Sequence, residues 1–418
     1  MKKINLLGIK DNLYLLIPIV SIGLWAIFNL MHNIITINRI FLPHNDFTDY
    51  YKAAKAFTAN PADLYDMDIM YPHLPVLAVV MSMTICLFPI LIATCIWYIC
   101  IYILGVLFTI EYNRILALMG VKAKLIRFSF LIIISSGWFI YSQFYQTTFK
   151  YAVGIIFLYI IRKEIQYRIE EKEKDLKFYF LNYNLLWFAV AIYPPALFIL
   201  LLYLFYDIRP INIFKRENIK IYIIVISVFA FQNFYFFINP PAIITFLNLY
   251  TTWDKYRDYF PLFYLSEWVY LNDYTLIYWA STLFISAITL ILIFNNNLKL
   301  EEKFAYLSFC SIIFSTYGDR VLIVLFPLAL LIYVPFLNQN ENIIDLLKEN
   351  RLISIGLLSV IIIYHMPPHF TIFKYFPIMK EYPFIIFIFL RWIFLLSVFI
   401  ASIIILNLRK FVYNQNMI

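Results

Sequence analysis

Apolar runs long enough to cross a lipid bilayer recur along the whole chain, with only short polar segments between them. A helix needs about 20 apolar residues to cross the ~30 Å hydrocarbon layer, and the repeated runs leave no room for a soluble domain. The composition agrees, because 63% of the 418 residues are hydrophobic and only 14% are charged. We therefore predict an all-α polytopic membrane protein in which residues 1–418 form a single integral membrane domain.

The apolar runs predict about twelve crossings. The first is placed at 13–31 and is followed by a polar and aromatic loop at 37–73. Further spans are predicted at 74–110, 127–142, 149–161, 178–192, 194–206, 220–238, 275–295, 304–316, 320–336, 352–364 and 383–407. The stretch 74–110 must cross an odd number of times if both of its ends keep the sides described next. We interpret it as one crossing plus a short re-entrant or interfacial helix near Pro89.

Basic residues lie mainly in alternate polar segments, which predicts the orientation of the chain. Basic residues favour the cytoplasmic side, and counting back from "NLRKFVYNQNMI" places "NNNLKLEEK", "IRPINIFKRENIK", "RKEIQYRIEEKEKDLK" and "EYNRILALMGVKAK" there. The outer side then receives the loop 37–73, Gln146, the turn 193–195, the loop 239–274, "STYGDR" and the loop 365–382. Orientation thus accounts for the net charge of +8, and we expect no nucleic-acid partner.

The first outer loop contains "DFTDYYKAAKAF", residues 46–57. As a helix, this segment places Asp46, Asp49, Tyr50 and Ala53 on one face, since positions three and four apart are neighbours. Carboxylates beside a membrane act as general bases, as metal ligands or as groups that bind the exposed N–H groups of a helix start. The spacing alone leaves open whether Asp46 caps the helix or performs chemistry.

The wider pattern resembles glycosyltransferase family 87, integral membrane enzymes of the GT-C class that use polyprenyl-phosphate sugars. The similar elements occur in the family's order: "DFTDYYKAAKAF", "LYDMDIMYPHLPVLAVV", "FYQTTFKYAVG", "AIYPPALFILLLYLF" and "STYGDRVLIVLFPLALL". The chain departs from the family at four positions. Tyr145 replaces a glycine, Thr148 stands where asparagine is usual, Ile192 stands where lysine is frequent, and Arg320 stands where histidine is common.

The resemblance implies a GT-C-type bundle that transfers a sugar, with mannose the family's commonest, from a polyprenyl phosphate to a hydroxyl of a glycolipid or glycan. It points to Asp46 as the general base on the outer face. The outer-face candidates for the donor phosphate are Arg320, Lys52, Lys150, Lys255 and Arg257. Arg320 is the first choice, because a guanidinium suits phosphate geometry. Other expected substrate-binding residues are Asp49, Tyr50, Lys52, Tyr71, Gln146 and Tyr193. No metal and no cofactor is expected, because the reaction has no pyrophosphate that needs a divalent ion.

Alternative interpretations exist for several of these residues. Arg320 can simply pair with Asp319, Asp49 can be an exposed helix charge, and the tyrosines can belong to the aromatic belt at the membrane surface. For Lys52 and Lys150 the favoured interpretation is that they reach the lipid headgroups.

Two other classes of membrane protein fit the composition. A lipid or saccharide transporter or flippase would carry charges in mid-span and paired broken helices. A polysaccharide polymerase or ligase would carry a large late outer loop. In this chain the polar residues collect at one predicted face and the prominent outer loop comes first, which favours the transferase.

Overall fold

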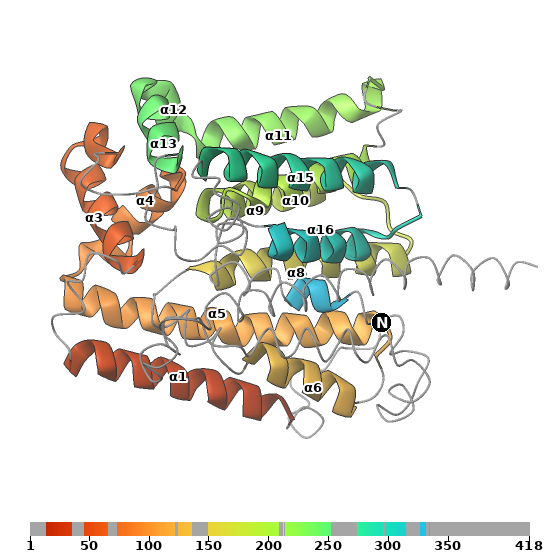
Figure 1. The fold of residues 1–418 in the computed structure, drawn as a ribbon, viewed down its shortest axis with the longest axis horizontal. Helices are drawn as coiled ribbons and strands as arrows, with labels where there is room; N and C mark the ends of the chain where they lie inside the picture. The colour runs from red at the N-terminus through yellow and green to blue at the C-terminus, as the bar shows by residue number, and fades with distance from the viewer. Residues whose placement is uncertain are drawn as a thin grey trace, which may run out of the picture. The chain divides into compact units, whose positions relative to one another are not determined.

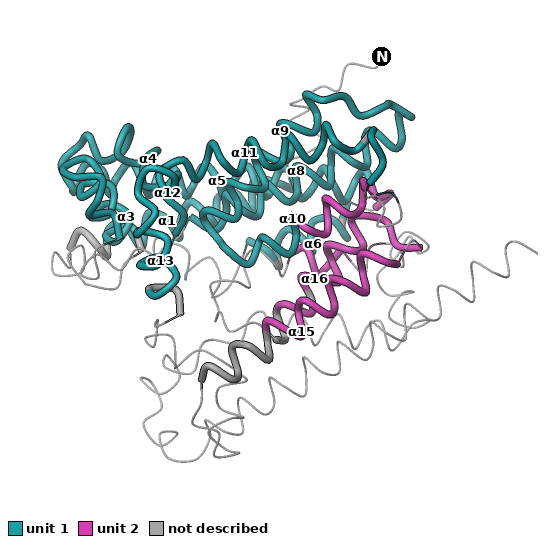
Figure 2. Tube along the Cα trace, turned by 90° about the horizontal axis from the view of Figure 1, so that it is seen from above, with its two compact units in different colours: residues 1–118, 124–200, 211–253 teal, residues 119–123, 201–210, 254–418 magenta. Residues whose placement is uncertain are grey.

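The structure is a computed structural model, and it describes residues 14–35, 46–65, 73–121, 124–135, 149–208, 212, 214–251, 274–295, 297–314, 327–331 and 334. These residues are mostly helical and none of them is in a β-strand, which confirms the all-α prediction for this part of the chain. The chain groups into two compact units, shown in Figure 2. Unit 1 comprises residues 1–118, 124–200 and 211–253, and unit 2 comprises residues 119–123, 201–210 and 254–418.

Among the described residues, the helix α5 (Ile90–Leu118) is long and apolar enough to cross a membrane by its length and composition. Its 29 residues span about 44 Å at 1.5 Å per residue, more than the hydrocarbon layer requires. Shorter apolar helical segments cover Leu16–Met31, Leu176–Ile192, Ala196–Asp207, Ile219–Gln232 and Thr282–Phe294. Together these helices suggest a protein that associates with a membrane.

Unit 1 is built around α5, and Figure 1 shows the neighbouring helices running along it. Glycines permit close approach at two crossings, as in many membrane helix pairs. A Cβ atom on Gly105 would lie 3.1 Å from Ile22, and one on Gly154 would lie 2.7 Å from the Phe108 ring. The packed pairs are α1 (Leu16–Ile35) with α5 and α6 (Lys124–Ser135), α8 (Lys150–Ile169) with α5, α9 (Leu176–Ile192) with α8, and α11 (Ile219–Gln232) with α9.

The first loop and the stretch after it form the helices that the sequence predicts. The segment "DFTDYYKAAKAF" lies in α3 (Asp46–Ala59), which is followed by the short 3-10 helix η2 (Pro61–Tyr65). The stretch 74–110 begins with a short helix, α4 (Pro75–Ser82), and a 3-10 turn, η3 (Ile85–Leu87). The long helix α5 then starts directly after Pro89, so this stretch contains a short helix near that proline and one long helix after it.

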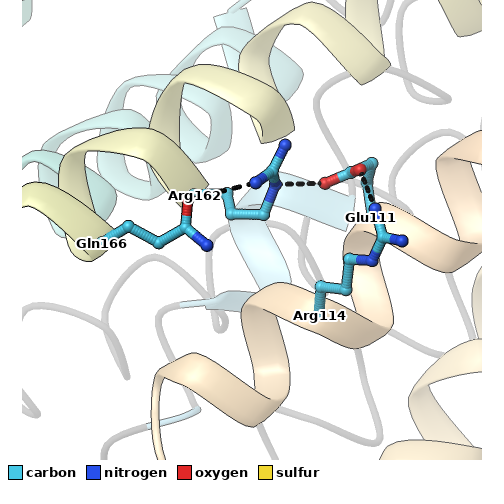
Figure 3. A network of polar contacts seen from close by, with 4 residues as sticks. All are labelled: Glu111, Arg114, Arg162 and Gln166. Carbon is cyan, nitrogen blue, oxygen red and sulfur yellow. Dashed lines mark hydrogen bonds and ion pairs between the residues drawn. The ribbon is translucent and has the colours of Figure 1, made fainter. Parts of the chain in front are cut away.

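Two helices continue past the predicted ends of their membrane spans, at residues 110 and 161. Helix α5 continues to Leu118 and α8 continues to Ile169, through charged residues that the sequence analysis assigned to cytoplasmic loops. Figure 3 shows the reason, which is a network of ion pairs between the two helices. Glu111 accepts from Arg114 and from Arg162 Nε, each at 2.6 Å, and Arg162 also donates to Gln166 at 3.1 Å. The charges are satisfied between helices, so the helices do not end there.

Unit 2 contains α15 (Tyr274–Phe294) and α16 (Leu300–Phe314), which pack on each other. Residues 201–207 of α10 (Ala196–Asp207) also belong to this unit. Helix α16 begins earlier than the predicted span at 304, because the Glu302 carboxylate accepts from the backbone N–H of Lys299 at 3.0 Å and satisfies a donor at the helix start. The Lys303 ammonium lies 5.5 Å from the ring centroid of Tyr206.

We predict that Glu111→Ala destabilises the protein by ~3 kcal/mol or more, because it leaves the Arg162 side chain, only 15% exposed, without its carboxylate. Arg114→Ala removes an arginine that is 39% exposed, and solvent screening limits its cost to less than about 1 kcal/mol. Thermal unfolding of the purified protein measures both. Equal losses of stability in the two variants would show that the Glu111–Arg162 pair between helices contributes no more than the Glu111–Arg114 pair within α5.

Candidate functional site

Helix α3 turns one face into the protein. Phe47, Tyr50, Ala53 and Ala54 are each at most 1% exposed, whereas Lys52 is exposed and Asp49 is half-buried. Asp46 is the first residue of the helix and Asp49 lies one turn later. The two aspartates therefore occupy the first turn, where the positive end of the helix dipole favours carboxylates.

A cluster of rings, Phe47, Tyr50, His73, Trp97 and Phe149, holds α3 against the other helices. Trp97 of α5 lies at its centre, with ring centroids 5.3 Å from Phe47 and 5.8 Å from Tyr50. Phe149 stacks on the same indole at 4.9 Å, and the His73 ring lies edge-on to Tyr50 at 5.0 Å. Residues from four separate parts of the sequence thus meet near the end of α5 that carries Ile90.

The end of the first loop is bonded to the end of α9. The Tyr65 hydroxyl donates to the His73 carbonyl at 2.8 Å, and the backbone N–H of Leu74 donates to the Ala191 carbonyl at 3.2 Å. The predicted segments 37–73 and 193–195 therefore lie beside each other.

Lys150, the first residue of α8, lies at the same place. Its ammonium donates to the Ile192 carbonyl at 3.3 Å and lies 5.2 Å from the ring centroid of Tyr193. Lys150 is only 8% exposed, so the expectation that it reaches the headgroups was wrong. The Lys150 ammonium thus reaches the backbone at the end of α9, 42 residues further along the chain.

Tyr193 and Tyr50 are enclosed by protein. They are 4% and 1% exposed, so the aromatic-belt interpretation is wrong for these two residues. Burial raises the pKa of the Tyr193 phenol, so the hydroxyl stays neutral to a higher pH than that of a tyrosine in water.

A second predicted outer segment packs on the first loop. The Tyr235 hydroxyl in α12 (Phe234–Ile238) donates to the Pro61 carbonyl at 2.7 Å. Tyr65 stacks on Phe236 at 5.7 Å and meets Phe246 of α13 (Pro241–Thr251) edge-on at 5.6 Å. The loops 37–73 and 239–274 were assigned to one side from charge alone, and their described parts do come together.

The described residues place only part of the predicted site. They bring together α3 with Asp49 and Tyr50, the start of α8 and Tyr193, and they leave Lys52 exposed on α3. Tyr71, Gln146, Arg320 and the side chain of Asp46 lie outside the described residues. The sequence analysis missed Trp97, its ring neighbour Phe149, and the contact of His73 with Tyr50. The sequence feature that could have identified Trp97 is its place as an aromatic residue about two helical turns after Pro89.

The arrangement combines carboxylates, a buried cation and rings at the end of apolar helices. Among the described residues, no group of three or more His, Cys, Asp or Glu side chains gathers in a way that would hold a metal ion. In comparisons with known proteins, no family model, no curated sequence and no solved structure matched the chain. The function must therefore be inferred from the chemistry of these residues and from the motifs.

We predict that Trp97→Ala lowers stability by about 3–5 kcal/mol, because it removes a buried ring that contacts α3 and Phe149. Trp25→Ala in α1 is the matched control. Trp25 is half-buried and meets the exposed Phe28 at 6.0 Å, so its loss should cost clearly less. The melting temperatures of the two variants test this prediction. A smaller decrease in melting temperature for Trp97→Ala than for Trp25→Ala would mean that the ring cluster does not anchor α3.

Proposed function

We propose that the protein is an integral membrane glycosyltransferase of the GT-C type with about twelve crossings. It transfers a sugar from a polyprenyl phosphate to a glycolipid or glycan hydroxyl at the outer face of the cell membrane. The observation that carries the proposal is the meeting of α3, the start of α8 and the end of α9 at one end of unit 1. These segments contain Asp46 and Asp49, Lys150, and Tyr193.

Exposed apolar faces support a location within the bilayer. Helix α1 exposes a row of side chains spaced three or four residues apart, at Ile17, Val20, Leu24, Ile27 and Met31. Helices α5, α11 and α15 also expose large apolar side chains, among them Ile99, Ile103, Ile223, Ile226, Leu290 and Ile291. Faces of this kind are costly in water and favourable against lipid.

The two ends of unit 1 differ in chemistry, which supports the proposed orientation. The end with Glu111 and Arg162 also holds the Lys174–Glu164 pair at 2.8 Å, together with the basic segments assigned to the cytoplasm. The opposite end holds α3, His73 and Tyr193. This opposite end is the one we assign to the outer face, following the distribution of basic residues.

The reaction requires a base and a phosphate-binding group. The acceptor oxygen attacks the anomeric carbon, its proton moves to the Asp46 carboxylate, and the bond between that carbon and the phosphate oxygen breaks with its electron pair on the phosphate. This displacement inverts the configuration of the anomeric carbon. Arg320 is assigned to the departing phosphate, where charge increases in the transition state. Asp49, Tyr71, Gln146 and Tyr193 are assigned to the sugar and acceptor hydroxyls.

The buried Tyr50 is assigned a positioning role. Its ring is 1% exposed and lies between His73 and Trp97, so it fixes the face of α3 that carries the aspartates. Lys52 lies on the exposed side of α3, so we assign it to contact with substrate only at the outer edge of the proposed site.

We predict that Asp46→Asn abolishes transfer while the melting temperature stays close to that of the wild type, because the amide cannot accept the proton. The control is Asp63→Asn in η2. Asp63 is exposed and accepts from Asn60 at 3.0 Å, so this change should leave turnover unaltered. Single-turnover transfer measures both. Retained turnover in Asp46→Asn, or loss of folding, would favour the helix-cap interpretation.

A labelling experiment tests the orientation. Thr58 on α3 and Glu173 between α8 and α9 are both exposed, so their reactivity reports the side of the membrane and not burial. In a background without the native cysteines at 86, 95, 100 and 310, Thr58→Cys should react with an impermeant thiol reagent added outside intact cells. Glu173→Cys should react only after the membrane is opened. Labelling of both from outside would contradict the proposed orientation.

A further inference from the structure

Arg127 lies in the first turn of α6, and none of the ion pairs between described residues involves it. Its Nε atom is buried and has no hydrogen-bond partner, and its guanidinium lies 5.8 Å from the ring centroid of Tyr14. A buried N–H group of a charged side chain is costly when it is left unpaired, so such a group calls for an explanation. Arg127 as a whole is half-buried and not enclosed, so a partner from outside the chain can reach it.

Tyr14 holds this guanidinium where three helices of unit 1 meet. The Tyr14 hydroxyl donates to Asn113 Oδ1 of α5 at 3.0 Å, and its ring lies against Arg127 of α6. Further along the same helices, the Ser21 hydroxyl of α1 donates to the Ser135 carbonyl of α6 at 3.2 Å. The order of these contacts means that α1 and α6 run in the same direction. Both helices therefore begin beside the C-terminal end of α5.

The charges around this position favour an anion. The starts of α1 and α6 both contribute positive potential, because the first N–H groups of a helix lack partners within the helix. On the adjoining turn of α5, Glu111 is shared by Arg114 and Arg162 (Figure 3). Two guanidiniums and one carboxylate leave one positive charge in excess, and Arg127 adds to it.

The surface of α1 next to this position suits acyl chains. Exposed apolar side chains begin one turn after Tyr14, at Ile17, and continue at Val20 and Leu24. They lead away from the guanidinium along the helix. By the orientation proposed above, this end of unit 1 lies at the inner leaflet, which is rich in anionic phospholipids. A lipid there can place its headgroup at Arg127 and its chains along α1.

We infer that Arg127 and Tyr14 form a site for the headgroup of an anionic phospholipid of the inner leaflet. The guanidinium donates to the phosphate oxygens, for which its planar geometry is suited. The tyrosine ring holds the guanidinium at the level of the headgroups. The inference rests on the bilayer location and orientation given under the proposed function. This lipid is separate from the polyprenyl phosphate, which the proposed reaction uses at the opposite end of unit 1.

The test is binding of a fluorescent phosphatidylglycerol to the purified protein in a neutral detergent. Arg127→Gln removes the charge, and Arg127→Lys keeps the charge but loses the planar fork. Arg114→Gln is the matched control, because it removes one positive charge from the same end. The Arg114 guanidinium is already paired with Glu111 at 2.6 Å, so it has no place in the proposed site.

Loss of a charge-assisted contact should weaken phosphatidylglycerol binding about tenfold or more in Arg127→Gln. We expect a smaller loss in Arg127→Lys and no change in Arg114→Gln. Phosphatidylcholine should bind all four proteins equally weakly, because its choline cation offsets its phosphate. Inorganic phosphate should compete poorly, because it has no acyl chains to contact α1.

Several results would overturn the assignment. Unchanged binding in Arg127→Gln would remove Arg127 from the site, and equal weakening in Arg114→Gln would mean that only the overall charge matters. Effective competition by inorganic phosphate would indicate a site for free phosphate and not for a lipid. If Arg127→Gln does not fold, Arg127→Lys decides, because binding as tight as that of the wild type would exclude the guanidinium.

The proposed function fails separately from this inference. The binding measurement involves no sugar transfer, so a protein that binds phosphatidylglycerol through Arg127 but transfers no sugar would keep this lipid site and lose the reaction. A protein that transfers sugar but binds phosphatidylglycerol equally well as Arg127→Gln would keep the reaction and lose the lipid site.

Discussion

Helices α5 and α8 contact each other near both ends, through the Trp97–Phe149 stack at one end and the Glu111–Arg162 pair at the other. The order of these contacts means that the two helices run in the same direction. Gly154 lets the helices approach closely between them, against Phe108. Because α1 and α6 pack on α5, and α9 packs on α8, the described part of unit 1 depends on this pair.

The two ends of the α5–α8 helix pair make different kinds of contact. At the Glu111 end, two arginines share one carboxylate, which satisfies charges that would otherwise be costly among apolar helices. At the Trp97 end, the contacts are between rings, and the charged Lys150 is held by a carbonyl and a ring. Arg114 and Arg162 at the Glu111 end are committed to the fold, whereas the Trp97 end carries the aspartates of α3. This difference is why we place the chemistry at the Trp97 end.

The sequence predicted local structure better than it predicted contacts. The pattern "DFTDYYKAAKAF" was enough to locate α3, and Pro89 was enough to separate α4 from α5. The continuation of α5 and α8 past the predicted spans was missed because Glu111 and Arg162 look like loop charges until their pairing across helices is known. The burial of Lys150 was missed for the same reason. It depends on a contact with Ile192 at the end of α9, which is 42 residues further along the chain. The distribution of basic residues placed the loops 37–73 and 239–274 on one predicted side, and in the structure Tyr65 of the first loop meets Phe246 of the second.

Release of polyprenyl phosphate is the most direct measurement of the proposed reaction. The purified protein in lipid is incubated with a panel of polyprenyl-phosphate sugars and a mixture of glycolipid and glycan acceptors, and free polyprenyl phosphate is quantified. We predict release with at least one donor, in amounts equal to the sugar transferred to an acceptor. Absence of release with every donor, from protein that is folded and binds polyprenyl phosphate, would contradict the assignment as a glycosyltransferase.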